Sequence, residues 1–261
     1  MSKIQRIVIL GAGNLATQLT CTLHESELEI VQVFSRTEKS AKELANRFNS
    51  AFTTKLEELV QDADLYIFAL SDKALLPVLE SISIPKGRFV HTAGSIPMDV
   101  FHGHTNKFGV FYPLQTFSKN RRVSFQKIPI CIEANNEELQ EDLKELAGRI
   151  STSQYLVSSD QRKQLHLAAV FTCNFANHMY SIGQKLLEDK GLDFDLLKPL
   201  IQETAEKVSE LDPVSAQTGP AVRFDEETMS SHEKALKATP DFQKLYRFVS
   251  ESIFKMHNKD S

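Results

Sequence analysis

The chain has 261 residues, of which 41% are hydrophobic, and its formal net charge is −4. A chain of this length and apolar content can bury a large core in one or two domains. The small negative charge, with no basic block, argues against nucleic acid or an anionic membrane surface as a partner. The early apolar run at residues 7–10 is too short for a signal peptide, and no later run reaches membrane-spanning length. We therefore expect a cytoplasmic protein with no membrane segment.

Neither the cysteines nor the histidines have the spacing of a metal site. Cys21, Cys131 and Cys173 are far apart in the sequence, so we expect free thiols in a reducing compartment. His102 and His104 have no third ligand nearby, which favours a loop over a metal centre. No metal is predicted.

The first half of the chain alternates strand signals with helix signals. Residues 65–70 form a nearly continuous apolar run, which is typical of a strand buried on both faces of a sheet. This alternation predicts an α/β fold with a Rossmann-type, doubly wound and mostly parallel sheet. The expected strands are residues 7–10, 29–34, 65–70, 88–91, 109–112, 128–132 and 154–157, and capping sequences predict helix starts at Ser35, Thr54, Asn135 and Ser158.

The pattern changes near residue 158, after which only helix signals follow. We predict a Rossmann-like dinucleotide-binding domain at residues 1–157 and an all-α substrate and dimerisation domain at residues 158–261. A long helix that leaves such a domain commonly finds more core in a partner subunit, so we expect a homodimer. The expected helices are residues 158–191, ended by Gly191, 196–211, with Pro199 in its first turn, and 239–254, begun by Thr239 and a proline.

A glycine motif stands directly after the first expected strand. Gly11, Gly13 and Ala16 have the spacing G-x-G-x-x-A and precede a helical pattern. In a dinucleotide-binding fingerprint the first glycine makes a tight turn and the second lets the backbone approach a pyrophosphate. The N–H groups of Asn14 and Leu15 would then face the phosphates at the start of the helix. The motif predicts a bound dinucleotide.

The end of the second expected strand indicates which dinucleotide. NAD sites usually carry Asp or Glu there, whereas NADP sites carry small polar and basic residues. This chain has Ser35, Arg36 and Thr37, with no acid before Glu38. Arg36 can bind a 2′-phosphate, and the two hydroxyls can donate to it. We predict NADP; the alternative is a surface arginine beside a helix cap.

Three later loops follow the carboxyl ends of expected strands, where the ligand of an open parallel sheet lies: residues 70–73, 91–95 and 112–117. Each loop also has a purely structural interpretation: a helix cap at Ser71 or Asp72, a glycine turn at Gly94, and a proline-shaped turn in the last. We predict cofactor contacts at Leu70, Ser71 and Thr92, and substrate contacts at Gly94, Ser95, Pro113 and Gln115.

The long expected helix carries polar side chains in an apolar stretch. At about 100° per residue, Asn174, His178 and Ser181 fall within about 60° of one another. Such a stripe either caps neighbouring backbone or faces a wet cleft. An imidazole can donate a proton to a substrate carbonyl or imine. His178 is the predicted catalytic residue, Asn174 would orient the substrate oxygen, and His166 is a weaker candidate; the alternative is that these histidines are structural.

Residues 218–220, Thr-Gly-Pro, interrupt the helical half shortly before an arginine. Arg223 can bind a substrate carboxylate through two parallel hydrogen bonds. It can equally pair with Asp225 or Glu226 and hold a turn.

Four segments of the sequence carry a family resemblance: residues 11–16, 112–117, 166–175 and 218–223. Together they resemble a family of NADP oxidoreductases with a Rossmann-like domain and a helical C-terminal domain of unassigned function. The architecture is also similar to pyrroline-5-carboxylate reductase and the β-hydroxyacid dehydrogenases. The latter carry an asparagine and, four residues later, a catalytic lysine; Asn174 is similar to that asparagine, but His178 replaces the lysine, which argues against hydroxyacid chemistry. The resemblance implies an NADP cofactor, a Rossmann-like fold and dimerisation, and it supplies no substrate.

These observations predict an NADP-dependent oxidoreductase that transfers hydride between the nicotinamide and a small carbonyl, imine or hydroxy substrate in a cleft between the domains. The alternative is a non-catalytic NADP-binding sensor or partner-binding protein on the same scaffold, because a fold does not fix a function.

Overall fold

The computed structural model of the protein describes residues 4–84 and 86–258. It divides into two compact units, Met1–Cys173 and Asn174–Ser261. The predicted domain boundary between residues 157 and 158 falls at Ser158, the N-cap of helix α5 (Ser159–Ala169). That boundary remains a prediction of where an independently folding domain ends.

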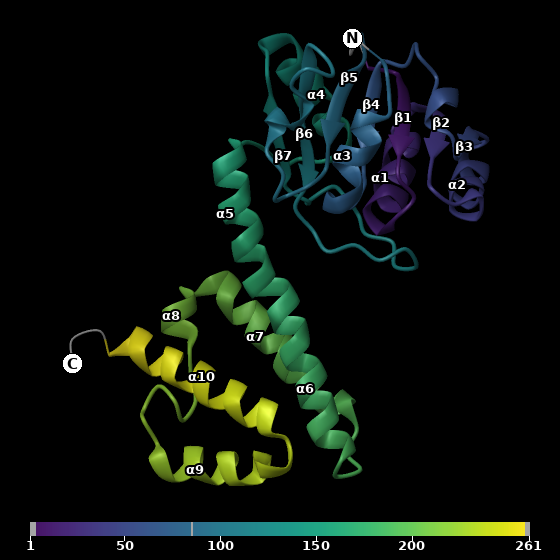
Figure 1. Ribbon diagram of the computed structural model, residues 1–261. Coiled ribbons are helices and arrows are strands. Elements are labelled where there is room, and N and C mark those ends of the chain that lie inside the picture. Colours follow the sequence, from purple (N-terminus) through teal and green to yellow (C-terminus); the bar gives the residue numbers. More distant parts are fainter. Residues whose placement is uncertain (1–3, 85, 259–261) are drawn as a thin grey trace. The chain divides into compact units, whose positions relative to one another are not determined.

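Unit 1 contains one sheet, whose strands are β1 (Arg6–Leu10), β2 (Glu29–Phe34), β3 (Ala51–Thr53), β4 (Leu65–Phe68), β5 (Arg88–His91), β6 (Lys107–Pro113), β7 (Ile130–Ala134) and β8 (Gln154–Leu156). Within the described residues, their order is β3-β2-β1-β4-β5-β6-β7-β8 (Figure 1). Neighbouring strands are parallel except β6 and β7, which are antiparallel. The predicted doubly wound, mostly parallel sheet is therefore confirmed, with β3 as a strand that the sequence pattern did not predict.

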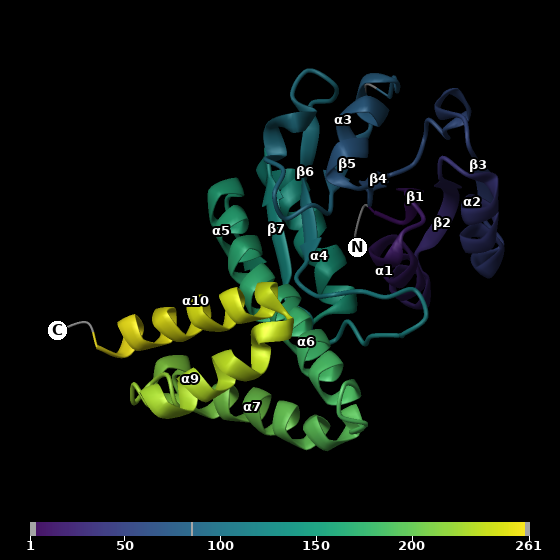
Figure 2. The ribbon, with the colours of Figure 1, turned by 60° about the horizontal axis from the view of Figure 1, so that its bottom comes forward.

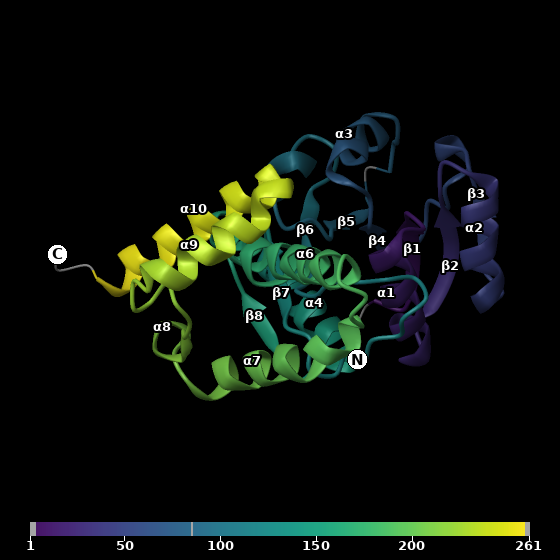
Figure 3. The ribbon, with the colours of Figure 1, turned by 90° about the horizontal axis from the view of Figure 1, so that it is seen from below.

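Helices cover both faces of this sheet. Side chains alternate across a strand, so Ile7 and Ile9 enter one buried core while Val8 and Leu10 enter the other. Figure 3 shows α1 (Asn14–Glu25) and α4 (Glu137–Ile150) on the side of the sheet opposite α3 (Asp72–Glu80). Because both faces are covered, the central strand β4 is buried along its whole length. Helix α2 (Glu38–Ala45) and 3₁₀ turns at Asn46–Phe48, Leu56–Glu58 and Met98–Phe101 complete the unit.

Only one of the four predicted capping sequences forms as predicted. Ser158 and Gln161 form a complete capping box, with both reciprocal hydrogen bonds. The prediction at Ser35 is wrong, because its N–H donates to the Thr53 carbonyl and extends the pairing of β2 with β3, so α2 begins after Thr37.

The other two capping predictions also fail locally. At Thr54 no side-chain cap forms, because the 3₁₀ turn begins one residue later, with Lys55 as its N-cap. The carboxylate of Glu58 accepts from the Thr53 hydroxyl (2.6 Å) and from Lys55 in this turn. At Asn135 the cap shifts by one residue: Asn136 accepts from the Leu139 N–H (2.9 Å), while the Asn135 side chain accepts from the Phe108 N–H. In each case a tertiary or neighbouring hydrogen bond displaces the cap.

Unit 2 is entirely helical in the described residues, as predicted. Its helices are α6 (Ala176–Glu188), α7 (Lys198–Glu210), α8 (Pro213–Ala216), α9 (Glu226–Ala235) and α10 (Pro240–His257), with 3₁₀ turns at Phe194–Leu197 and Leu236–Ala238. Helices α9 and α10 lie side by side (Figure 2), held by a hydrogen bond between His232 and Tyr246 (2.9 Å) and an ion pair between Glu233 and Arg247. No helix in the described part of the chain has the length and hydropathy needed to cross a bilayer.

The predicted helix at residues 158–191 contains a π-helical segment at Val170–Phe175. Such a segment has hydrogen bonds from i to i+5 and changes the rotation per residue. Asn174 lies inside it, and the predicted alignment of Asn174 with His178 and Ser181, which assumed about 100° per residue throughout, remains a prediction. The predicted end is confirmed: Gly191 has φ +67°, and the N–H of Leu192 bonds the carbonyl of Leu187 in a Schellman motif.

Candidate active site

The two glycines of the motif, Gly11 and Gly13, have different surroundings in the structure. Gly11 has φ +125°, and a Cβ there would lie 2.2 Å from the carbonyl oxygen of Ala69. Gly11 is therefore required by the close approach of the β1 turn to the end of β4. A Cβ on Gly13 would meet no heavy atom within 4 Å, so Gly13 leaves open space. The fold requires the first glycine, whereas the second leaves open space at the start of α1.

The start of α1 is built to accept an anion. Gly13 is the N-cap and supplies no side chain to the first turn, which contains no acidic residue. The first N–H groups of a helix have no intrahelical partner, so those of Asn14, Leu15 and Ala16 are available beside the positive end of the helix dipole. Asn14 is exposed, whereas Ala16 is buried against the sheet. This geometry fits a pyrophosphate.

The end of β2 lies next to the glycine turn. The N–H of Gly11 donates to the carbonyl of Phe34 (2.8 Å), which is the last residue of β2. Ser35, Arg36 and Thr37 follow directly, and Arg36 is exposed. Within the described residues Arg36 makes no ion pair, so its guanidinium is available to an anionic ligand.

Parallel pairing brings the carboxyl ends of β1, β4 and β5 to one edge of the sheet. The Leu70 side chain lies 3.5 Å from the position of a Cβ on Gly11. Thr92 is buried and its N–H donates to the Phe68 carbonyl (3.3 Å), and Ser71 is the exposed N-cap of α3. The structure thus brings together the predicted cofactor residues that follow β1, β4 and β5. Their contact with a cofactor remains a prediction.

The predicted substrate residues of unit 1 lie along the same edge. The Ser95 hydroxyl donates to the carboxylate of Asp72, which joins the loop after β5 to the start of α3. Pro113 is buried as the last residue of β6. Gln115 is exposed, and its side-chain oxygen accepts from the Thr116 N–H (2.8 Å).

Gly94 lies directly beneath a histidine. A Cβ on Gly94 would lie 2.6 Å from Nδ1 of His166, and the same Nδ1 is 3.3 Å from the hydroxyl of Tyr112. Burial, and to a lesser extent the Cys131 thiol, raises the pKa of the Tyr112 phenol, which therefore stays protonated at neutral pH. This arrangement gives His166 a more specific setting than the sequence pattern indicated.

A buried arginine fixes the loop that contains Gly94. Arg162 is completely buried and forms an ion pair with Glu133 of β7. Its guanidinium also donates to the carbonyls of Ala93 (Nε, 3.2 Å) and Ile96, on either side of Gly94. Sequence analysis missed Arg162 and Glu133, because their partners are distant in the sequence and no local pattern marks a buried arginine.

Three predicted site residues belong to unit 2. Asn174 and His178 are exposed, and their predicted roles in catalysis remain predictions. Arg223 is exposed and forms no ion pair among the described residues. The Asp225 N–H donates to the Pro220 carbonyl (3.0 Å), and the pKa of the Asp225 carboxyl is lowered by hydrogen bonds from Thr228 and, less strongly, by the charge of Arg223. Both predicted roles of Arg223 therefore stay predictions.

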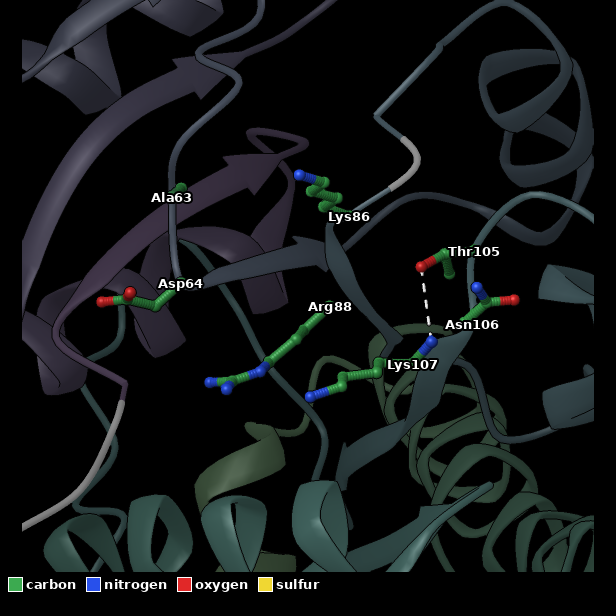
Figure 4. Close-up of a pocket in the computed structure, with 7 residues that line it drawn as sticks. All are labelled: Ala63, Asp64, Lys86, Arg88, Thr105, Asn106 and Lys107. Carbon is green, nitrogen blue, oxygen red and sulfur yellow. Dashed lines mark hydrogen bonds between the residues drawn. The ribbon is translucent and has the colours of Figure 1, made fainter.

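A cavity of about 610 Å³ lies at the opposite, amino edge of the sheet (Figure 4). Arg88 and Lys107, the first residues of β5 and β6, project toward it. Both cations are ion-paired with Glu138 of α4 (3.6 and 2.6 Å), and Arg88 also pairs with Asp142 of α4 (3.4 Å), so two carboxylates balance the two cations. This cavity is remote from the strand ends at which a parallel sheet binds its ligand.

A strand, a glycine turn and an anion-accepting helix start at the carboxyl edge of a doubly wound sheet define a dinucleotide-binding α/β protein. Residues 6–91 match the family model described as "NADP oxidoreductase coenzyme F420-dependent", and residues 128–253 match "Domain of unknown function (DUF2520)". The chain belongs to the family of NADP oxidoreductases that combines these two domains. Such a family binds a nicotinamide dinucleotide and acts on small molecules. None of the curated proteins gives a significant match.

Solved structures agree with this assignment. A Bacteroides fragilis protein whose name assigns it provisionally to the NADP oxidoreductases is 49% identical, with a TM-score of 0.91 over 97% of this chain and 98% of that chain. A pyrroline-5-carboxylate reductase from Streptococcus pyogenes is 14% identical, with a TM-score of 0.66 over 97% and 100% of the two chains. An imine reductase from Myxococcus stipitatus in complex with NADP⁺ is 14% identical, with a TM-score of 0.60 over 97% and 93%. The last two similarities establish the fold alone.

Proposed function

We propose that this protein is an NADP(H)-dependent reductase or dehydrogenase of a small carbonyl, imine or hydroxy compound. The observation that carries the choice of NADP is the sequence Ser35-Arg36-Thr37 at the end of β2, beside the glycine turn. A carboxylate at this point would accept hydrogen bonds from a ribose and repel a 2′-phosphate. An unpaired guanidinium with flanking hydroxyls attracts the phosphate instead.

The residues of unit 1 hold the cofactor in this proposal. The open space at Gly13 admits the pyrophosphate, and the N–H groups of Asn14 and Leu15 donate to it. Arg36 binds the 2′-phosphate, with Ser35 and Thr37 as further donors. The bound nicotinamide supplies the hydride chemistry, and the protein positions it and excludes competing reactions.

Two relatives of known activity support the reaction class. Pyrroline-5-carboxylate reductase and imine reductase are both named for the reduction of a C=N bond, and the latter structure contains NADP⁺. We therefore place small cyclic imines first among the candidate substrates, followed by keto acids. The predicted roles of Leu70, Ser71 and Thr92 toward the cofactor, and of Asn174, His178 and Arg223 toward the substrate, belong to this proposal.

The test compares two cofactors on one variant. Replacing Arg36 by Ala should weaken NADPH binding roughly 10- to 150-fold, the equivalent of a charged hydrogen bond of about 1.5–3 kcal/mol, and should change NADH binding less than about twofold. Binding is followed by the fluorescence of the reduced nicotinamide. Arg149→Ala, an exposed arginine in the last turn of α4, is the matched control and should change neither. Equal losses for both cofactors would refute the 2′-phosphate assignment.

The predicted homodimer is part of the same proposal. Four large apolar side chains of unit 2 are more than half exposed in the single chain: Leu196, Leu200, Phe248 and Met256. Leu196, in the 3₁₀ turn that leads into α7, is four residues from Leu200, and Phe248 and Met256 are eight apart on α10. Residues at these spacings share one side of a helix, and an apolar patch of this kind favours burial by a second subunit. Light scattering at micromolar concentration should give twice the mass of 29.4 kDa, and a monomeric mass would exclude the dimer.

A further inference from the structure

Three elements of unit 1 converge on the imidazole of His166. Helix α5 carries it, β6 supplies Tyr112, and the loop after β5 supplies Gly94. The ring of Tyr112 meets the imidazole edge to face, with centroids 6.4 Å apart at 70°. A Cβ on Gly94 would lie 2.6–2.9 Å from Nδ1, Cγ and Cβ of His166. No side chain fits between the loop backbone and the imidazole, so the glycine is matched to this histidine.

The two ring nitrogens of His166 have different surroundings. Nδ1 faces the Tyr112 hydroxyl at 3.3 Å. Nε2, on the far side of the ring, receives no hydrogen bond from residues 4–84 or 86–258, and the side chain is half-buried. The Tyr112 hydroxyl can donate to Nδ1 or accept from it, and in either case Nε2 is left to exchange a proton. The phenol therefore positions the imidazole with Nε2 available.

The position of this histidine is rigidly determined. Arg162 lies one helical turn before His166 on α5 and binds the carbonyls of Ala93 and Ile96, which flank Gly94. Its ion pair with Glu133 is buried, and Glu133 also accepts from the N–H of Ser159 at the start of α5 (2.8 Å). These bonds lock α5 and the loop after β5 to each other. A functional group is effective when its supporting residues fix it in this manner.

The histidine also lies at the edge of the sheet where the cofactor is proposed. Gly94 follows β5, which is separated from β1 by β4 alone. Two strand spacings place it about 10 Å from the glycine turn along this edge. A dinucleotide whose pyrophosphate lies at Gly13 extends in this direction across the strand ends.

We propose that His166 exchanges the proton of the reaction at its Nε2, and that Tyr112 is a positioning residue acting through Nδ1; this inference rests on the proposed function. In the reductive direction the substrate C=N or C=O carbon gains a hydride from the reduced nicotinamide. The substrate nitrogen or oxygen gains the Nε2 proton, the imidazolium becomes neutral imidazole, and solvent restores its proton. The reverse reaction uses neutral His166 as the base. The proton donor is then a residue of unit 1, and His178 takes no part in this step.

A measurement without turnover tests the positioning. In the full-length protein labelled with ¹⁵N-histidine, the imidazole resonances of His166 are assigned by their loss in His166→Asn. Tyr112→Phe should shift the Nδ1 and Nε2 resonances of His166, whereas Tyr155→Phe, at an exposed tyrosine of β8, should leave them unchanged. Gly94→Ala should shift them as well, because the added methyl displaces the ring. Unchanged His166 resonances in Tyr112→Phe would overturn the proposed pair.

Single-turnover oxidation of NADPH tests the proton transfer, with 2-methyl-1-pyrroline as the imine and pyruvate as the keto acid. His166→Asn should lower the rate of hydride transfer by about 10²–10⁴ and change NADPH binding less than twofold. The pH profile of the rate should change as well. Tyr112, Arg162, Cys131 and Cys173 are the other ionisable or charged groups of this cluster. The exposed His102, changed to Asn, is the matched control.

The outcomes separate the inference from the proposed function. A wild-type chain that binds NADPH and reduces a probe, with His166→Asn equally fast and with the same pH profile, would overturn the inference and leave the function intact. A wild-type chain that fails to bind NADPH, or oxidises it with neither probe, would overturn the proposed function and the proton transfer with it. A large loss of rate in His166→Asn at unchanged cofactor affinity supports both.

Discussion

The buried ion pair of Arg162 with Glu133 offers a quantitative test of how the site is held. Arg162 has no exposed surface, and Glu133 is 16% exposed. Replacing Arg162 by Met leaves the carboxylate without its partner and removes the donors to two loop carbonyls. Removing one member of a buried pair costs about 3–5 kcal/mol. For a unit of 173 residues this loss lowers Tm by roughly 6–20 °C.

Differential scanning calorimetry measures the shift, and a second ion pair serves as control. Arg247 and Glu233 pair across α9 and α10, with 56% and 25% of their side chains exposed. Arg247→Met should therefore cost no more than about 1 kcal/mol. Adding Glu133→Gln to Arg162→Met should cost less than the sum of the two single changes, with a coupling of about 1–3 kcal/mol. The reasoning fails if Arg162→Met shifts Tm no further than Arg247→Met does.

Three further predictions concern stability. Gly11→Ala should destabilise unit 1 by about 2 kcal/mol or more, because φ is positive and the methyl meets the Ala69 carbonyl at 2.2 Å; urea denaturation that shows less than about 0.5 kcal/mol would contradict this. Burial lowers the pKa of His91 from its ordinary value of 6.5 to about 3. The part of the folding free energy that depends on a neutral His91 is therefore fully present above about pH 6.5 and is lost as the pH falls from there toward 3. Between pH 7.5 and pH 5 the free energy of unfolding should fall by about 2 kcal/mol, and His91→Gln should remove that part of the pH dependence. Asn136→Ala should cost about 1 kcal/mol, whereas Thr37→Ala, at a cap without a side-chain hydrogen bond, should cost less than half of that by the same denaturation assay.

The sequence by itself determined the features that depend on a few neighbouring residues. The spacing of Gly11 and Gly13 can be recognised from neighbouring residues, although the close contact that requires Gly11 is with Ala69, after β4. The mostly parallel, doubly wound sheet follows from the alternation of apolar strand segments with helical segments, since both faces of a parallel sheet must be covered. The capping box at Ser158 is confirmed, and both of its hydrogen bonds join residues only three positions apart, Ser158 and Gln161.

Tertiary structure decided the features in which distant groups compete. The N–H of Ser35 joins a sheet ladder instead of beginning a helix, and β3, its partner, gave no clear sequence signal. Arg162 lies 29, 66 and 69 residues from Glu133, Ile96 and Ala93, so no local pattern could show that its charge is buried and satisfied. The setting of His166 has the same origin: the fold brings a loop, a strand and a helix together on one imidazole, and a sequence pattern records none of those three contacts.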